Sequence, residues 1–71
     1  MNFKDRIKQE YIEVATRLSK LEKFTEDVTN SADMDVRDWN DLILQRGIMR
    51  SYVSILENRM FNLGIEYEEI D

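Results

Sequence analysis

The stretch VRDWNDLILQRGIMRSYVSILENRMFNL, residues 36–63, decides the fold of this chain. At about 100° per residue its apolar residues form one helical stripe, made of Leu42, Met49, Val53, Leu56, Met60 and Leu63. Three more apolar residues, Leu44, Ile48 and Ile55, widen this side to nearly half of the helix circumference. An ordinary amphipathic helix has an apolar stripe somewhat over ~100° wide. The stretch therefore predicts a helix with more apolar surface than one partner helix covers.

The first part of the chain predicts a second helix, over residues 3–27. Its apolar residues recur at alternating spacings of four and three, with Thr25 in one weak slot, and they are Ile7, Tyr11, Val14, Leu18, Leu21 and Val28. Such spacing suits two helices that pack nearly antiparallel. The short polar residues at 29–33 compete with helix through bonds to the local backbone, so we expect a turn there. The fold class is all-α, an antiparallel helical hairpin with helices at about 3–27 and 36–63.

The ends of the later helix carry recognisable signals. Asp35 has the residue type and position of an N-cap. Gly64 is expected to end the helix, with Ile65 as the apolar contact of a Schellman motif. Gly47 lies in mid-helix, where Gly costs ~1 kcal/mol relative to Ala. Either another helix or a ligand approaches there, or the glycine is a tolerated defect.

Length and composition limit the function classes. With 71 residues the chain forms one domain, 1–71, of marginal stability, ending in a short acidic tail. It has no Cys and no His, which removes the thiolate ligand, the commonest metal ligand and the commonest general base. With two glycines there is no Gly-rich phosphate loop. We expect no metal, no cofactor and no enzymatic activity.

Charge and hydropathy address location and partners. A charged start without a signal peptide, and no apolar run of ~18 residues, predict a cytoplasmic protein that does not span a membrane. The net charge of −5 argues against duplex DNA as a partner, because DNA binding relies on clustered Lys and Arg. The ten basic residues still allow a local anion pocket.

The apolar residues left over by the hairpin predict self-association. Exposed apolar patches often mark interaction surfaces, and two hairpins packed together make a four-helix bundle. We assign the oligomer interface to Trp39, Leu44, Ile48 and Ile55. The alternative is that these residues cover the loop and the tail. Trp39 suits an interface anchor and a lid over the hairpin core equally well.

Polar residues embedded in the apolar side predict a ligand site. Gln45, Tyr52 and Arg59 recur every seven residues and form one stripe. At an oligomer interface, Arg can bind phosphate bidentately and Tyr offers a ring face for a base. Arg17 and Lys20 of the first helix lie beside the seam and supplement such a pocket. In the alternative interpretation, Gln45 and Arg59 form hydrogen bonds across a subunit interface. Arg59 would then pair with Glu10 or Glu13, an interpretation that spacing alone favours.

At these residues the chain resembles a family of short phage-encoded helical hairpin proteins related to a crAss-like phage product. The matching run in the later helix is Leu42, Gln45, Met49, Tyr52, Ile55-Leu56 and Arg59-Met60. The matching positions in the first helix are Glu10, Leu18, Lys20-Leu21 and Phe24. The resemblance extends from about Glu10 to Met60, and Gly47 and the loop at 29–33 depart from it.

The resemblance implies a phage origin and an accessory role against host immunity, in the host cytoplasm. More remotely, the hairpin is similar to anti-CBASS sponges, which oligomerise and sequester cyclic nucleotides without cleaving them. That similarity implies a base-stacking role for Tyr11 and a phosphate-binding role for Lys20. Two other interpretations stay open, a protein-binding inhibitor that docks its Leu44/Ile48/Ile55 face on a host protein, and a purely structural assembly protein.

Overall fold

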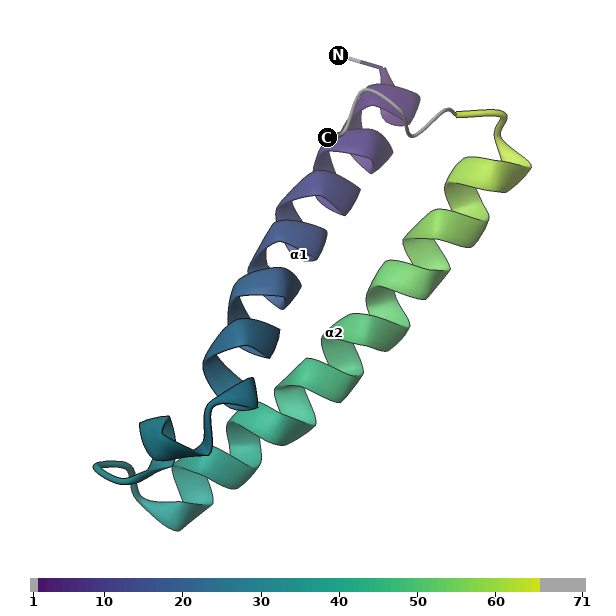
Figure 1. Cartoon of the computed structure of the whole chain (residues 1–71). Helices are drawn as coiled ribbons and strands as arrows, with labels where there is room; N and C mark the ends of the chain where they lie inside the picture. The colour runs from purple at the N-terminus through teal and green to yellow at the C-terminus, as the bar shows by residue number, and fades with distance from the viewer. Residues whose placement is uncertain (1, 66–71) are drawn as a thin grey trace.

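The computed structural model describes residues 2–65 as two antiparallel helices (Figure 1). Helix α1 spans Phe3–Glu26 and helix α2 spans Val36–Asn62, and the short 3₁₀ helix η1, Val28–Ser31, lies between them. The predicted all-α hairpin is confirmed, with each helix ending within one residue of its expected bound. The predicted acidic tail lies outside the described residues.

Capping side chains and a glycine define the helix ends. The Asn2 side chain accepts a 2.9 Å hydrogen bond from the Asp5 backbone N–H, and Asp35 accepts a 2.7 Å bond from the Arg37 N–H. At the far end of α2, Gly64 has φ +71°, and the Ile65 N–H donates to the Met60 carbonyl at 2.9 Å. This bond is the 6→1 contact of a Schellman motif, so the predicted ending is confirmed.

The connection between the helices is held by short polar side chains. The Asp27 carboxylate accepts from the Thr29 backbone N–H at 3.0 Å and from its hydroxyl at 2.6 Å. These two bonds lower the pKa of Asp27 below its usual value, the hydroxyl bond contributing most. Asn30 donates from its side-chain amide to the Phe24 carbonyl at 2.8 Å, which satisfies an end group of α1. Local hydrogen bonds therefore turn the chain, as the composition of 29–33 predicts.

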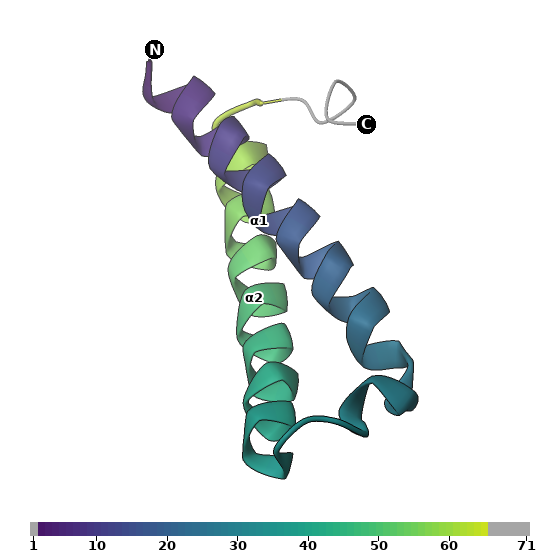
Figure 2. The ribbon, with the colours of Figure 1, turned by 90° about the vertical axis from the view of Figure 1, so that its left-hand side faces the viewer.

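The core lies toward the end of the hairpin where α1 begins and α2 ends. Ile7, Leu56 and Met60 are buried together, and the partly buried residues packed on them are Tyr11, Val14, Leu63 and Ile65. In Figure 2 the two helices cross near this end and diverge toward the connection. Leu56 and Met60 are completely buried, so this cluster dominates the apolar contact between the helices.

The predicted seam of α1 holds except at its end. Thr25 is buried, and its hydroxyl donates to the Leu21 carbonyl at 2.8 Å while accepting from Arg46 Nη1 at 3.0 Å. The one polar position of the predicted seam is therefore buried with its hydroxyl group fully hydrogen-bonded. Val28 was expected in the seam, but it is 71% exposed. That expectation is wrong because the backbone turns extended at Asp27, so the helical periodicity stops before Val28 is reached.

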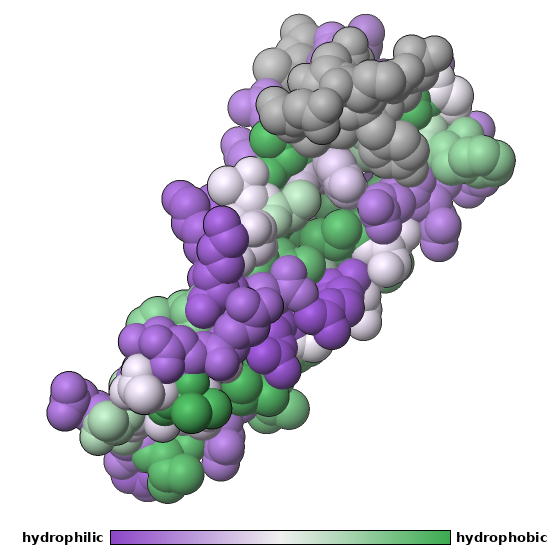
Figure 3. Space-filling view, in the orientation of Figure 1, coloured by the Kyte–Doolittle hydropathy of each residue, from purple (hydrophilic) through white to green (hydrophobic). Residues whose placement is uncertain are grey.

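Much apolar surface remains outside the core. Figure 3 shows apolar residues along the line between the helices and near the connection, with polar residues beside them. The large apolar side chains that are exposed include Phe61, Val36, Leu44, Ile48 and Ile55. One helix–helix contact leaves these side chains in solvent.

Replacing Leu56 with Ala should destabilise the hairpin by about 2–5 kcal/mol, because it opens a cavity in the only core cluster described. Urea unfolding followed by circular dichroism measures this loss. Leu44→Ala is the matched control, since Leu44 is 64% exposed and should change the free energy by less than ~0.5 kcal/mol in dilute protein. Equal losses at the two positions would contradict the described core.

The two glycines should respond in opposite directions to replacement by Ala. At Gly64 the positive φ makes Ala cost about 1–2 kcal/mol. At Gly47 an added Cβ meets nothing within 4 Å among the described residues, so Ala should stabilise the helix by ~1 kcal/mol. Thermal melts of both variants test this. A destabilised Gly47→Ala variant would indicate that another molecule needs the space.

Candidate functional site

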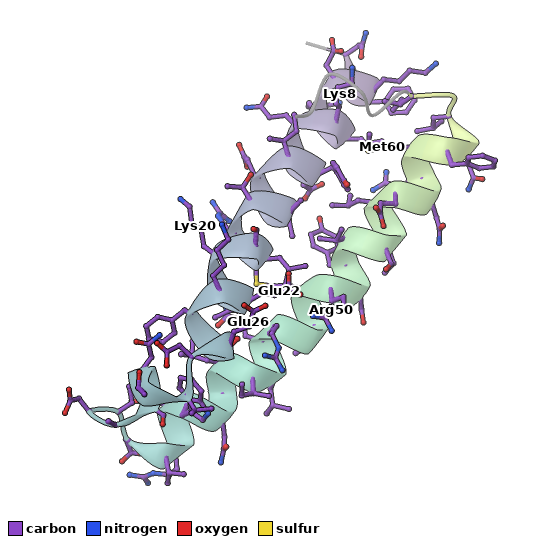
Figure 4. All side chains as sticks on the ribbon, viewed as in Figure 1. Lys8, Lys20, Glu22, Glu26, Arg50 and Met60 are labelled. Carbon is purple, nitrogen blue, oxygen red and sulfur yellow. The ribbon has the colours of Figure 1, made fainter. Side chains whose placement is uncertain are left out.

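Polar contacts join the helices on both flanks of the core. On one flank, the Tyr11 hydroxyl donates to Glu57 Oε2 at 3.4 Å, and Arg50 forms an ion pair with Glu22. Figure 4 shows Arg50 of α2 beside Glu22 of α1. On the opposite flank, the Tyr52 hydroxyl donates to Glu10. The two tyrosines therefore lie on different sides of the hairpin.

A surface hollow lies on α1, on the same flank as Tyr11. We call it the α1 groove, and its lining residues are Tyr11, Ile12, Ala15, Thr16, Ser19, Lys20 and Lys23. Its volume is ≈ 400 Å³, and every lining residue belongs to α1. Figure 4 shows Lys20 extending from α1 on the side away from α2. The groove is thus a shallow, open surface feature of one helix.

The α1 groove has the chemistry of an anion site. Lys20 and Lys23 bring two ammonium groups, each with three hydrogen-bond donors. Two hydroxyls, from Thr16 and Ser19, also line it; the Thr16 hydroxyl donates to the Ile12 carbonyl at 2.7 Å, which leaves its oxygen as an acceptor. No carboxylate lines this groove.

The Tyr52 flank has the opposite electrostatic character. The hydrogen bond to Glu10 is the main cause that raises the pKa of Tyr52 above its usual value; burial and the charge of Glu10 act in the same direction, and Arg59 opposes them. The second hollow, ≈ 330 Å³, is lined by Arg6, Gln9, Glu10 and Glu13, so two carboxylates face it. These acids disfavour an approaching phosphate, and Arg6 in the same hollow and Arg59 near Tyr52 offset them only in part. This flank is less suited to an anion than the α1 groove.

The structure divides the predicted ligand residues between these places. Tyr11 and Lys20 line one groove, whereas Tyr52 has Arg59 nearby on the opposite flank. Lys20 therefore does not lie with Tyr52 within one chain, and a pocket built on the stripe at a subunit interface stays a prediction. Gln45 donates from Nε2 to the Met49 sulfur at 3.7 Å, and Arg17 is exposed on α1. Within residues 2–65, Glu10 bonds Tyr52 and no ion pair joins Arg59 to Glu10 or Glu13.

Sequence reasoning missed three groove residues, Thr16, Ser19 and Lys23. Their signal was present in the spacing, because Ile12, Thr16, Ser19 and Lys23 follow one another at four, three and four residues. Such residues share one helix face. In a sequence, a polar helix face indicates only solvent-exposed surface. The hollow between these side chains is known only from the structure.

The predicted oligomer interface is exposed on α2. Leu44, Ile48 and Ile55 are 64%, 69% and 54% exposed. Trp39 is partly buried and packs on Phe24, with ring centroids 6.1 Å apart and planes inclined at 48°. This contact lies within the hairpin near the connection, away from the core cluster of Ile7, Leu56 and Met60, so the role of Trp39 as an interface anchor or a lid stays a prediction.

Residues 2–65 contain no group of three His, Cys, Asp or Glu side chains arranged to hold a metal ion. None of the helices over these residues has the length and apolar character needed to cross a membrane.

Replacing Glu10 with Gln should lower the pKa of the Tyr52 phenol, because the charged hydrogen-bond acceptor is lost. The pKa of Tyr52 is higher in the folded chain than in the unfolded chain, where it is about 10. The Tyr52–Glu10 bond therefore stabilises the fold below pH ~10, and this stabilisation is lost as the pH rises through the folded pKa. Absorbance titration at 295 nm, as the difference between each protein and its Tyr52→Phe variant, isolates this phenol. An unchanged pKa in Glu10→Gln would contradict the bond.

Comparison with known proteins identifies a family. A family model described as Sequestin matches residues 1–62, which include both helices, the α1 groove and Tyr52. No curated protein and no solved structure is significantly similar to the chain. The family name suggests a function in binding and sequestering a partner molecule, which fits the resemblance to sequestering phage proteins. With its two helices and their connection inside the match, the chain belongs to the Sequestin family.

Proposed function

We propose that this protein sequesters a cyclic nucleotide signal of host immunity by binding it without cleavage. The observation that carries the proposal is the α1 groove, where Lys20 and Lys23 lie with Tyr11 and no carboxylate. The family name supports sequestration in general, and the choice of a cyclic nucleotide comes from the chemistry of the groove and the resemblance to phage sponges.

Each part of a nucleotide has a partner of suitable chemistry in the groove. Lysine ammonium groups bind phosphate oxygens as point charges. The Tyr11 ring lies at the same groove and is the stacking partner for a base, a contact worth about 1–3 kcal/mol. The hydroxyls of Thr16 and Ser19 match ribose hydroxyls and the polar edge of a base. A cyclic nucleotide offers all of these groups within a small volume.

The residue inventory supports binding without cleavage. The whole chain has no His and no Cys, so the commonest general base and the thiolate nucleophile are missing. The groove residues also include no acid that would activate water. We therefore assign a stoichiometric role, one groove and one nucleotide per chain, in the cytoplasm of the phage's host.

Self-association of the hairpin is part of the same proposal. The exposed row at Leu44, Ile48 and Ile55 supports it, because an isolated hairpin of this size leaves large apolar side chains in water. The same row supports a second candidate function, a protein-binding inhibitor that docks this face on a host protein. That function would require the row but not the α1 groove.

Isothermal titration calorimetry with cyclic mono-, di- and trinucleotides tests the proposal, with ATP and NAD as linear controls. Lys20→Ala should weaken binding by about tenfold, since a hydrogen bond to a charged group contributes ~1.5–3 kcal/mol. Lys4→Ala removes the same charge from the first turn of α1, outside the groove, and should leave the affinity unchanged. Heating the complex should release the nucleotide intact, as chromatography measures.

Three outcomes would contradict this assignment. No heat with any cyclic nucleotide would refute the ligand class and favour the protein-binding alternative. Loss of binding in Arg59→Ala with full binding in Lys20→Ala would move the site to the Tyr52 flank. A cleaved nucleotide would refute sequestration without chemistry.

A further inference from the structure

One face of α2 carries an ordered sequence of charges and apolar residues that the hairpin does not use. We call it the α2 outer row; it consists of Asp41, Leu44, Ile48, Ile55 and Arg59. At 100° per residue these five positions lie within about 60° of one another. All five residues are exposed, and neither Asp41 nor Arg59 takes part in an ion pair within residues 2–65.

The α2 outer row is complementary to itself when reversed. Asp41 lies nine residues before Arg50 and Arg59 lies nine residues after it. Leu44 lies six residues before the same midpoint and Ile55 five residues after it. In an antiparallel pair of α2 helices, Asp41 of each copy therefore faces Arg59 of the other, and Leu44 faces Ile55.

We propose that the α2 outer row pairs antiparallel with the same row of a second copy of this chain. The two-fold axis crosses the row at the level of residue 50, on the side of α2 opposite the Arg50 side chain. In an isologous interface the same patch of each copy contacts the other, so the patch must be complementary to itself. The α2 outer row meets this condition because an acid lies at one end, a base at the other, and apolar residues lie between them. A parallel pair would set Asp41 against Asp41 and Arg59 against Arg59, and such like-charge contacts are costly. The order of charges therefore favours a second copy of this chain as the partner of the row, and it favours an antiparallel orientation of the two α2 helices.

This pairing gives a structure to the self-association in the proposed function, and it rests on that self-association. It produces a four-helix assembly with α2 helices at the centre. Every residue of the α1 groove belongs to α1, so the pairing is independent of the nucleotide contacts. The two proposals can therefore fail separately.

Cysteine cross-linking tests the direction of the pair, because the native chain contains no Cys. Leu44→Cys and Ile55→Cys replace exposed side chains, so folding should persist. Each variant alone should stay uncross-linked, because in the antiparallel pair equivalent positions are well over 10 Å apart along the helices. An equimolar mixture should give a disulfide-linked heterodimer on non-reducing gels, since disulfides need Cα atoms within ~7 Å.

Charge exchange tests the register. Asp41→Arg alone and Arg59→Asp alone should each weaken dimerisation by about tenfold or more, because like charges then meet twice in each dimer. The double variant, Asp41→Arg with Arg59→Asp, should return the dissociation constant to within about threefold of wild type. Sedimentation analysis measures these constants, and Lys4→Asp on α1 is the control with the same charge change as Arg59→Asp.

Several results would overturn the inference. A wild-type chain that stays monomeric at all concentrations would show that no second copy occupies the row. Cross-linking of Leu44→Cys alone as fast as the mixture would show a parallel pair, and a double variant as weak as the singles would show a different register. A monomer that still binds nucleotide through Lys20 would refute only the pairing, whereas a confirmed dimer indifferent to nucleotides would refute only the ligand.

Discussion

A hairpin of two helices has one internal interface, and every other property of this protein depends on that limit. Leu56 and Met60 are buried completely, and few other side chains approach this state. Each helix can turn only one stripe toward the other. The remaining faces of α1 and α2 stay in contact with solvent, so the binding surfaces that these two helices offer are their outer faces.

Polar side chains complete the interface at its edges, and this arrangement separates the two sides electrostatically. Tyr11, Glu22 and Thr25 of α1 bond to α2 on one side, whereas Glu10 holds Tyr52 on the other. Because Glu10 is engaged with the phenol, its carboxylate stays at the Tyr52 flank. The α1 groove with its two lysines and the Tyr52 flank with its mixed charges are therefore distinct surfaces of one chain.

In the proposed function, ligand binding and assembly use different outer faces of the hairpin. The α1 groove carries ammonium groups and an aromatic ring, which are the groups that nucleotides need. The α2 outer row carries apolar residues between opposite charges, which are the groups that a second copy needs. Because the two surfaces lie on different helices, a small sequestering protein can associate and bind ligand without one interaction blocking the other.

The sequence by itself determined the helices, their ends and the buried stripe, because these depend on local hydrogen bonding and on a fixed 3.6-residue period. Asp35 and Gly64 bound α2 by rules that need no distant partner. Only the tertiary structure decided that Val28 leaves the seam, that Trp39 packs on Phe24, and that Tyr11 with Lys20 lies apart from Tyr52. These outcomes depend on how each helix is rotated about its axis and on where the chain turns. The periodicity of residues within a single helix carries no information about either.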